Sequence, residues 1–446
     1  MRGLNLFALA LVAASGGAWT QQPTVGQTRG EVEKPGRNFS SSGDARLNDY
    51  IRMSLDRNPG LSQALAQYRA ALQRLPQVAA LPDPMLAFTN YLRTPETRVG
   101  SQTNVITLSQ QFPWFGTLGM REQVAAKEAA SYRQQYEAAK DEAVRQVKTA
   151  YYSLAFIDLA LGINDEERLL LDHYEKLAEA RYRQGAGLQQ AAVKLQAEIT
   201  RVQSRLEGLR SRRVDAEASL NTLMVRPAET PVAGIKLPPV PAVDIDYKQL
   251  YQAGRRNRPE VLASLLEIER DEKRIELARK DYWPSFSVGG TFVNVLARPV
   301  APGATPPDSN GMNVWSVNLG ISLPLHRGKY DAGVAEATEA KVASTHGYQE
   351  TVNAVESSIR EVGFRIGTLR EQMTLFNTTL VPQTQQSLRS AEAAYSTGSL
   401  GVLDLLDSER VLLEVRLGLA QLVTDYMKSL ADMERAIGSP FPEVKP

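Results

Sequence analysis

Two aspartates near the end of the chain stand three residues apart, directly after a turn-forming segment. Asp404 and Asp407 follow the sequence YSTGSLG (395–401), and an apolar pattern with helical spacing follows them. Residues three apart lie on one face of a helix, so both carboxylates would point the same way. Acids in the first turns of a helix also complement its dipole. The pair is therefore either a helix-start feature or a charged site that attracts cations.

Other reactive groups are scarce. The chain contains no cysteine and three histidines, which excludes thiolate chemistry, disulfides and Cys/His zinc sites. His173, His326 and His346 share no ligand spacing, so we expect no metal site. The sequence has no Ser/His/Asp motif and no phosphate-binding glycine loop. We therefore expect neither an enzyme nor a bound cofactor.

The composition indicates a folded protein without a basic excess. The 446 residues are 43% hydrophobic, 23% charged and 7% aromatic, which excludes disorder and suits either two or three domains or one elongated fold. Lys and Arg number 51 against 50 Asp and Glu, a formal net charge of +1. A protein that binds phosphate backbones is usually far more basic, so nucleic acid is not an expected partner.

The N-terminus has the pattern of a secretory signal peptide. Arg2 precedes the apolar segment LNLFALALVAA (4–14), and the small residues at 16–18 predict cleavage after Ala18. We expect residues 1–18 to be removed and residues 19–45 to form a loose arm. After the first residues no run reaches the roughly 18 apolar residues of a membrane-spanning helix. Any passage through a membrane would therefore use β-strands.

Two similar halves follow one another in the sequence. Pro59 in LDRNPGL and Pro84 in LPDPMLAF have counterparts in Pro259 in RRNRPEV and Pro284 in YWPSFSV. We expect a first repeat at 46–226, a linker at 227–246, a second repeat at 247–438 and a tail at 439–446. Each repeat would contain a short helix, a medium helix, two strands, a very long helix, a tip and a return helix. The tips are expected at about 182–188 and about 395–401, and LARPVAPGATPPDSNG (296–311) predicts a lengthened loop in the second repeat.

The long helices carry the spacing of coiled coils. The helix from about 115 to 184 would be roughly 105 Å long at ~1.5 Å per residue. In the second repeat apolar residues alternate in steps of three and four over about four heptads, which predicts a buried seam. Its members are Val352, Val355, Ile359, Val362, Ile366, Leu369, Met373, Phe376 and Leu380. The return helices offer matching seams at Leu195, Ile199, Val202, Leu206 and Leu209, and at Leu412, Val415, Leu419, Leu422 and Tyr426.

Four segments alternate between apolar and polar residues. These predicted strands lie at about 85–92, 104–112, 285–296 and 312–323, close to the ~9 to 11 residues of a tilted transmembrane strand. Four strands cannot close a barrel alone, whereas a trimer would supply twelve. A small soluble β-domain would show the same alternation, and a simple long coiled-coil protein would share the helices, so both alternatives stay open at this point.

The chain as a whole resembles the TolC-type outer-membrane efflux factors. The resemblance covers nearly all of the mature chain and rests on the signal peptide, the two repeats, the paired strands and the two tips. Also similar are AEASLNTLMVRP (216–227) and MERAIG (433–438), which close the two repeats. The motifs LPDPML (81–86) and QQFPWFGTLGMR (110–121) most resemble the heavy-metal cation branch.

This resemblance implies a mixed α/β membrane protein that works as a homotrimer. A twelve-stranded β-barrel, four strands per subunit, would lie in the lipid of the cell outer membrane, and a long α-helical coiled-coil barrel would continue it into the periplasm. The tips would dock a periplasmic membrane-fusion adaptor served by an inner-membrane pump of the RND type. The protein would passively conduct heavy-metal cations, or alternatively drugs. The alternative function is a periplasmic coiled-coil adaptor.

The resemblance also assigns the site residues. Asp404 and Asp407 match the paired aspartates at the family's closed periplasmic end, which makes them the expected gate. The first repeat has Ala191 and Lys194 at the aligned positions, so each subunit supplies one acidic pair. Leu400 occupies the place of a basic latch residue found in some relatives. The residues expected to dock the adaptor are Tyr182, Gly185, Leu188, Tyr395, Gly398 and Leu400.

Overall fold

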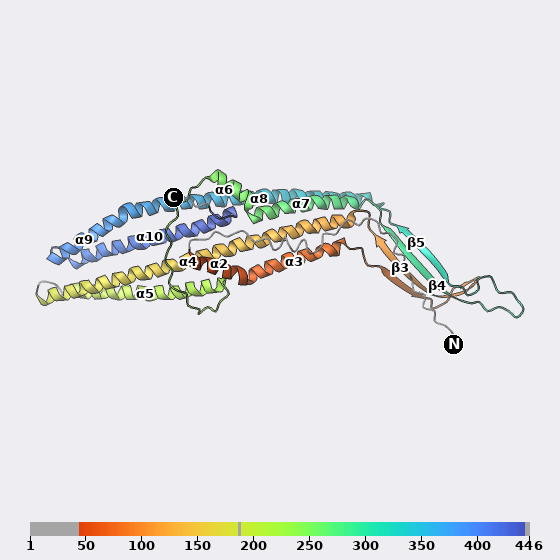
Figure 1. Ribbon diagram of the computed structural model, residues 1–446, viewed down its shortest axis with the longest axis horizontal. Helices are drawn as coiled ribbons and strands as arrows, with labels where there is room; N and C mark the ends of the chain where they lie inside the picture. Colours follow the sequence, from red (N-terminus) through yellow and green to blue (C-terminus); the bar gives the residue numbers. More distant parts are fainter. Residues whose placement is uncertain (1–43, 186–188, 442–446) are drawn as a thin grey trace. The chain divides into compact units, whose positions relative to one another are not determined.

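The computed structural model describes residues 44–185 and 189–441, all within the compact unit Ser42–Pro446. The predicted signal peptide, almost all of the predicted arm, Leu188 and most of the tail lie outside the described residues. The described part is mostly helical. Its helices and strands are labelled as in Figure 1.

The two halves of the chain follow a similar order of elements, except that the first has the additional short strand β2 and the second has its long helix divided by η1. The first half comprises α2 (Ala45–Arg57), α3 (Pro59–Ala79), β1 (Met85–Asn90), β2 (Glu96–Thr97), β3 (Gly100–Phe112), α4 (Thr117–Arg183) and α5 (Gln189–Leu223). The second half comprises α6 (Tyr247–Asn257), α7 (Pro259–Lys280), β4 (Phe286–Leu296), β5 (Val314–Ile321), α8 (Arg327–Leu375), the π-helical turn η1 (Phe376–Leu380), α9 (Val381–Thr397) and α10 (Val402–Ile437).

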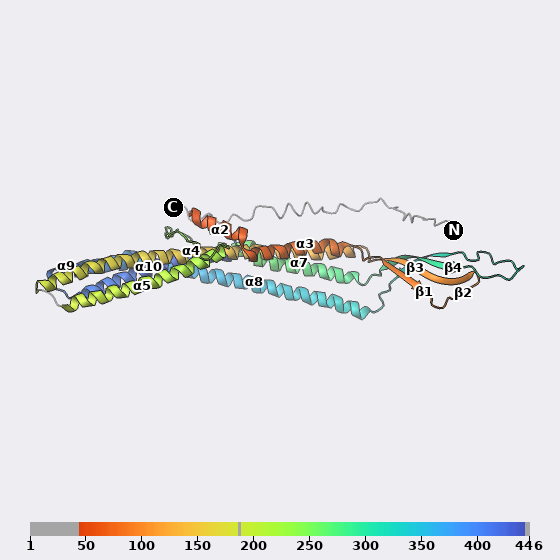
Figure 2. The same ribbon diagram turned by 90° about the horizontal axis from the view of Figure 1, so that it is seen from below.

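Short helices stack in pairs along the long ones. Both α3 and α5 pack on α4, while α7 and α10 both pack on α8, and α4 also contacts α7 and α10. Figures 1 and 2 show α5 beside the part of α4 remote from the sheet and α3 beside the part next to it. The tips of the hairpins α4/α5 and α9/α10 therefore lie together at the end away from the sheet.

The predicted seam of the second long helix is found as far as the π turn. Its first seven members, from Val352 to Met373, are buried, whereas Phe376 and Leu380 are only half-buried. After η1 the buried residues are Leu388, Ala391 and Tyr395, one position later than an unbroken repeat would place them. A π turn contains an extra residue, and this one ends two residues before Pro382, which cannot donate an α-helical hydrogen bond. The insertion therefore keeps one helix face buried across the proline.

The predicted seam of α10 was wrong by one residue over most of its length. Leu412, Val415, Leu419 and Leu422 are half-buried, whereas the buried stripe passes through Val402, Leu406, Glu409, Leu413, Ala420 and Met427. The cause is that α10 carries two adjacent apolar stripes and packs against α4, α8 and α9 at once. Helical periodicity does not identify which stripe faces the neighbouring hairpin.

The segment between the halves is tied to both hairpins. Arg213 of α5 donates through Nη2 to the Val232 carbonyl at 3.0 Å, and Tyr426 of α10 donates to the Pro241 carbonyl at 2.9 Å. Val232 and Val243 are buried. This linker therefore joins the hairpins through side-chain to backbone bonds without forming a helix or strand of its own.

The strands form one antiparallel sheet in the order β1-β3-β4-β5, with the short β2 paired to β3. The pairing of β3 with β4 joins the two halves of the chain. Strand β3 begins at Gly100 rather than near 104, because residues 101 and 102 pair with the end of β4. Strand β5 is shorter than expected and begins at Val314, since Asn313 instead accepts a hydrogen bond from the Val295 N–H through its side chain at 3.0 Å.

The two faces of the sheet differ in polarity as the alternation predicts. On one face Thr107 lies opposite Thr291, with 3.1 Å between their hydroxyl oxygens, and Asn318 donates to Thr291 Oγ1 at 2.6 Å. The other face is apolar and open, with Trp315 68%, Val317 76% and Leu319 80% exposed. Its further members are Leu86, Phe88, Ile106, Leu108, Val288, Phe292 and Ile321.

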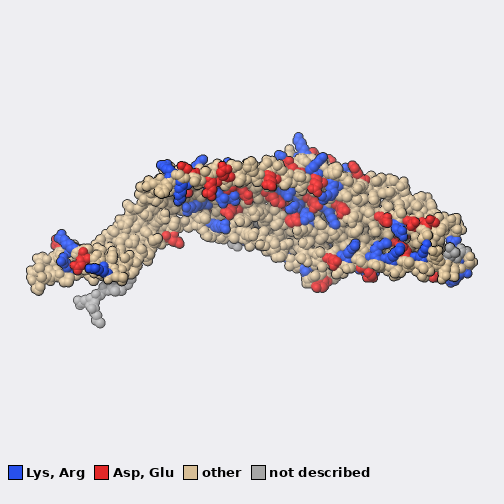
Figure 3. Space-filling view, turned by 180° about the vertical axis from the view of Figure 1, so that it is seen from behind, with Lys and Arg blue, Asp and Glu red and all other residues tan. Residues whose placement is uncertain are grey.

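Charged side chains avoid this sheet. Strands β1, β3, β4 and β5 contain no Asp, Glu, Lys or Arg. Figure 3 shows the uncharged region between the densely charged helices and a few charges in the loops beyond the strands. Within residues 44–185 and 189–441, no helix contains an apolar stretch of the length that a membrane-spanning helix requires.

Candidate functional site

The tip of the second hairpin is a glycine turn that presents Asp404. Helix α9 ends at Thr397, and Gly398 follows with φ of 81°, a left-handed conformation that glycine adopts without steric cost. The N–H groups of Gly398 and Ser399 bond to the carbonyls of Tyr395 at 3.1 Å and Ala394 at 3.0 Å. The chain thereby reverses, and α10 begins with Asp404 in its first turn.

The first hairpin reverses in a related way. Helix α4 ends at Arg183, and Gly185, with φ of 71°, bonds through its N–H to the Tyr182 carbonyl at 3.0 Å. Residues 186–188, which include the predicted contact residue Leu188, lie outside the described residues. Helix α5 then begins at Gln189.

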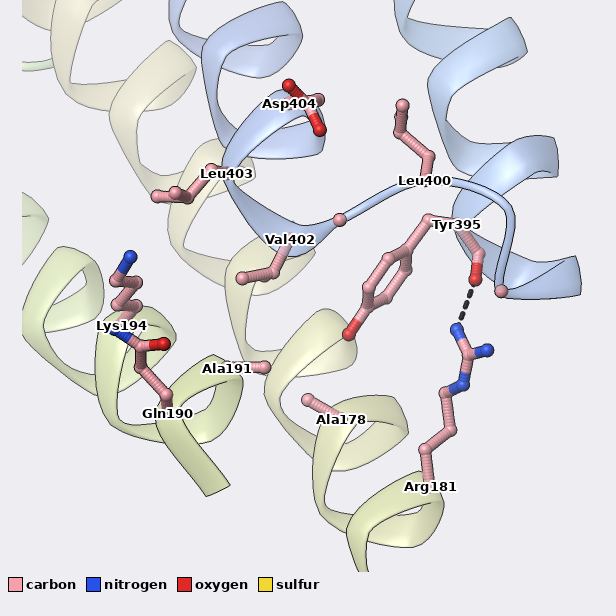
Figure 4. A pocket seen from close by; sticks show the side chains of 12 residues that line it. Ala178, Arg181, Gln190, Ala191, Lys194, Tyr395, Leu400, Val402, Leu403 and Asp404 are labelled. Carbon is pink, nitrogen blue, oxygen red and sulfur yellow. Dashed lines mark hydrogen bonds between the residues drawn. The ribbon is translucent and has the colours of Figure 1, made fainter. Parts of the chain in front are cut away.

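A pocket of about 360 Å³ lies between the two tips. Figure 4 shows Tyr395 and Leu400 on one side, Ala178 and Arg181 of α4 below them, and Gln190, Ala191 and Lys194 of α5 facing the start of α10. The remaining lining residues are Gly398, Gly401, Val402, Leu403 and Asp404. The pocket is thus apolar at its base and carries charges of both signs at its margin.

Arg181 holds the two tips together. Its Nη1 donates to the Tyr395 carbonyl, as the dashed line in Figure 4 shows, and its guanidinium carbon lies 5.3 Å from the centre of the Tyr395 ring. Tyr395 is 5% exposed, and burial raises the pKa of its hydroxyl. Sequence reasoning missed Arg181, although a basic residue in the last turn of a helix is a recognisable signal because it complements the dipole.

The two candidate gate aspartates are exposed on one face of α10. Asp407 is 72% exposed in its side chain and pairs with Arg410, with 3.5 Å between Oδ1 and Nη1. The other Arg410 nitrogen, Nη2, lies 3.8 Å from Glu198 Oε2 on α5. Arg410 therefore links a candidate gate residue to the other hairpin.

The predicted site residues are only partly brought together. Tyr395, Gly398, Leu400 and Asp404 line the same pocket. Tyr182 does not line it and is 49% exposed, because the inward position on α4 belongs to Arg181. Asp407 instead borders a second hollow of about 340 Å³ between α9 and α10.

The histidines are dispersed. His173, His326 and His346 are all exposed. Within the described part of the chain, no group of three His, Asp or Glu side chains is placed to hold a metal ion. The chemistry available at the tips is accordingly electrostatic, supplied by carboxylates and guanidinium groups.

The amino-acid sequence matches the profile of a known protein family. The sequence profile of the outer membrane efflux proteins matches residues 50–225 and 250–439. The chain belongs to this family. It is therefore an outer-membrane transport protein of the efflux type, and the alternative of a periplasmic adaptor is excluded.

Individual relatives span most of the chain at low identity. Nodulation protein T of Rhizobium leguminosarum bv. trifolii is 22% identical over 90% of this chain and 87% of its own length. Outer membrane protein OprJ of Pseudomonas aeruginosa is 24% identical over 90% of this chain and 85% of its own.

A solved structure shows the same fold. The outer membrane protein VceC of Vibrio cholerae superposes with a TM-score of 0.72 at 18% identity, covering 90% of this chain and 98% of that one. The fold of this efflux-family member is thus the TolC-like channel fold. The resemblance to the heavy-metal branch stays a prediction, because these relatives do not distinguish the cargo.

Proposed function

We propose that this efflux-family protein forms a homotrimer whose twelve strands close a β-barrel in the outer membrane. The observation that carries the proposal is the open apolar face of the sheet. Monomeric soluble proteins rarely expose contiguous apolar patches of this extent, whereas transmembrane barrels turn such a face to lipid and a polar face to the lumen.

The edges of the sheet support the same assembly. Strands β1 and β5 are the outer strands in the order β1-β3-β4-β5, and within residues 44–185 and 189–441 no further strand pairs with the outer side of either. The backbone groups of an edge strand need partners in a membrane. Pairing of β5 with β1 of a neighbouring copy would satisfy them and, repeated three times, would close the ring.

An aromatic cluster lies where the strands meet the helices. Trp114 and Trp283 stack with ring centres 4.8 Å apart, and Phe286 lies 5.7 Å from Trp114. Trp283 is 53% exposed and Phe115 77%. Tryptophan is enriched at the membrane–water boundary, so this cluster would mark the periplasmic edge of the membrane and leave the helices in the periplasm.

The trimer would act as a passive conduit. The repeated hairpins would continue the barrel as a coiled-coil tube, Asp404 and Asp407 would gather around its narrow end, and the tips would dock a periplasmic adaptor served by an inner-membrane RND pump. The pocket between Tyr395, Leu400 and the first tip is the proposed contact for adaptor hairpins. No catalytic step is needed, because the pump supplies the energy.

A matched pair of substitutions tests the barrel. Val317→Lys places a charge on the apolar face at mid-strand, at a cost of about 2–4 kcal/mol in each subunit, so the heat-modifiable trimer should be lost from outer-membrane fractions. Ser316→Lys, one residue away on the polar face, should assemble and conduct in planar bilayers. Equal trimer yields from the two variants would contradict the proposed barrel.

For the cargo we propose heavy-metal cations. The support is the resemblance of LPDPML (81–86) and QQFPWFGTLGMR (110–121) to the heavy-metal branch and the cation-attracting pair Asp404 and Asp407. A strain lacking the gene should become sensitive to zinc, cobalt or cadmium salts and recover on complementation. Sensitivity to drugs alone would assign the conduit to a drug pump instead.

A further inference from the structure

Three glutamates meet in the interior next to the tip. Glu167 of α4, Glu198 of α5 and Glu409 of α10 are 5%, 7% and 5% exposed. They come from both hairpins, and Glu409 interacts electrostatically with each of the other two. Carboxylates are rarely buried unless they are paired, so each of the three requires either a neighbouring cation or a bound proton.

Two of the three glutamates are paired with arginine. Glu167 Oε2 lies 2.9 Å from Arg205 Nη1, which also donates to Asn164 Oδ1 at 3.0 Å. Glu198 Oε2 lies 2.8 Å from Arg201 Nη1 and 3.8 Å from Arg410 Nη2.

For Glu409, by contrast, no ion pair with Lys or Arg exists among residues 44–185 and 189–441. A third carboxylate is therefore buried beside two others without a cation of its own.

The groups that face Glu409 come from several helices. Burial, followed by the charges of Glu167 and Glu198, raises the pKa of Glu409 to about 8, against the opposing effect of Arg205 and Arg410. Burial also raises the pKa of Glu167. Tyr174 of α4 adds a hydroxyl that donates to Glu392 of α9. Burial and the two neighbouring carboxylates thus favour the protonated form of Glu409.

The position of Glu409 connects this proton to the candidate gate. Glu409 lies on the buried stripe of α10, between Asp407 and Arg410 in sequence. Arg410 in turn spans from Asp407 to Glu198 on the other hairpin. A charge placed on Glu409 would therefore strain the packing of α10 against the first hairpin at the level of the gate.

We propose that Glu409 is a proton-dependent latch between the two hairpins. With its proton bound, α10 stays packed on α4 of the first hairpin, and loss of the proton loosens this contact and frees the Asp404/Asp407 end. The inference rests on the gate in the proposed function and adds its regulation.

The direction of the pH effect follows from proton linkage. A hydrated carboxyl has a pKa of about 4.3, so the closed packing binds more protons than a loosened one between that value and about 8. Stabilisation of the closed packing is full below about pH 4.3 and declines as the pH rises to about 8. Alkaline periplasmic pH should favour the open tip.

Planar-bilayer conductance of the full-length protein tests the latch. For the wild type we expect conductance to rise at least about tenfold between pH 6 and pH 9 on the tip side. A difference of one pKa unit between the closed and the loosened tip changes the ratio of their populations tenfold. Glu409→Gln keeps the shape of the protonated form and should stay at the low level throughout. Glu167→Gln removes a neighbouring negative charge, so the transition should shift to lower pH by about one unit.

Two further measurements keep the outcomes apart. Asp404→Asn/Asp407→Asn retains Glu409 and should retain the rise with pH. Amide hydrogen exchange of residues 402–412, corrected for its intrinsic pH dependence, should accelerate at pH 9 in the wild type and not in Glu409→Gln. A wild type that conducts but shows no rise with pH, or a Glu409→Gln variant that keeps the rise, overturns the latch. Absence of conductance at every pH contradicts the conduit itself, and the exchange experiment then still decides the latch.

Discussion

The two helical hairpins have the same construction but differ in continuity. In the first, α4 runs unbroken for 67 residues and α5 returns over 35. In the second, the long helix is divided into α8, the π turn η1 and α9, and α10 returns over 36 residues. A π turn and a proline weaken the regular hydrogen bonding of a helix. The second hairpin is therefore the one that combines an irregular helix with the candidate gate.

The hairpins also differ in the charge of their tips. The first contributes Arg181 and Lys194 to the pocket, whereas the second contributes Asp404. Yet the buried residues of both belong to one hydrophobic cluster, from Leu171 and Leu195 to Leu405 and Leu406. The difference shows that a shared core can carry two chemically distinct ends, one suited to holding the tips and one suited to attracting cations.

The largest effect is expected from opening the shared core. Leu195 and Leu405 are both fully buried, so Leu195→Ala and Leu405→Ala should each lower the free energy of unfolding by about 2–5 kcal/mol. Val193→Ala is the control, because Val193 is 56% exposed. Thermal and denaturant unfolding of the purified protein measures all three. If only one of the leucine variants is destabilised, the hairpins do not share a core.

A smaller effect is expected from neutralising the acidic tip. Asp404→Ala/Asp407→Ala should bind multivalent cation blockers roughly tenfold more weakly, since that factor corresponds to only about 1.4 kcal/mol of lost attraction. Stability should fall by about 0.3–1 kcal/mol for each acid that leaves the helix start. Lys194→Ala, at the aligned position of the first tip, should keep the selectivity for cations. Bilayer recordings with unchanged blocker affinity in an assembled double variant would remove the gate assignment.

The smallest effect is expected from regularising the second long helix. Deleting Thr379 together with Pro382→Ala would remove the extra residue of the π turn and give one unbroken repeat from Val352 to Tyr395, so the melting temperature should change little. Deleting Glu361 instead would break the seam of α8 and should clearly lower the melting temperature. A Thr379 deletion as damaging as the Glu361 deletion would show that the π turn has a role beyond keeping the seam in phase.

The periodicity of apolar residues within a single helix or strand predicted which side of that element is buried or faces lipid. The seam from Val352 to Met373 and the apolar face containing Val317 and Leu319 are both found, because a helix or strand with one buried or lipid-facing side repeats that side in its sequence. The seam of α10 could not be placed in this way, since its two apolar stripes are adjacent and only the packing against α4, α8 and α9 selects one.

The sequence by itself determined the efflux-family architecture. It specifies strands in which apolar and polar residues alternate, helices too long for a compact domain, and glycine turns at Gly185 and Gly398. The tertiary structure alone decided which charged groups meet. Arg181 rather than Tyr182 reaches Tyr395, and Glu409 lies beside Glu167 and Glu198, residues more than 200 positions away in the chain. Spacing along a helix fixes the direction of a side chain, whereas burial and the charges from other helices set its protonation. Those surroundings exist only after the two hairpins have packed together.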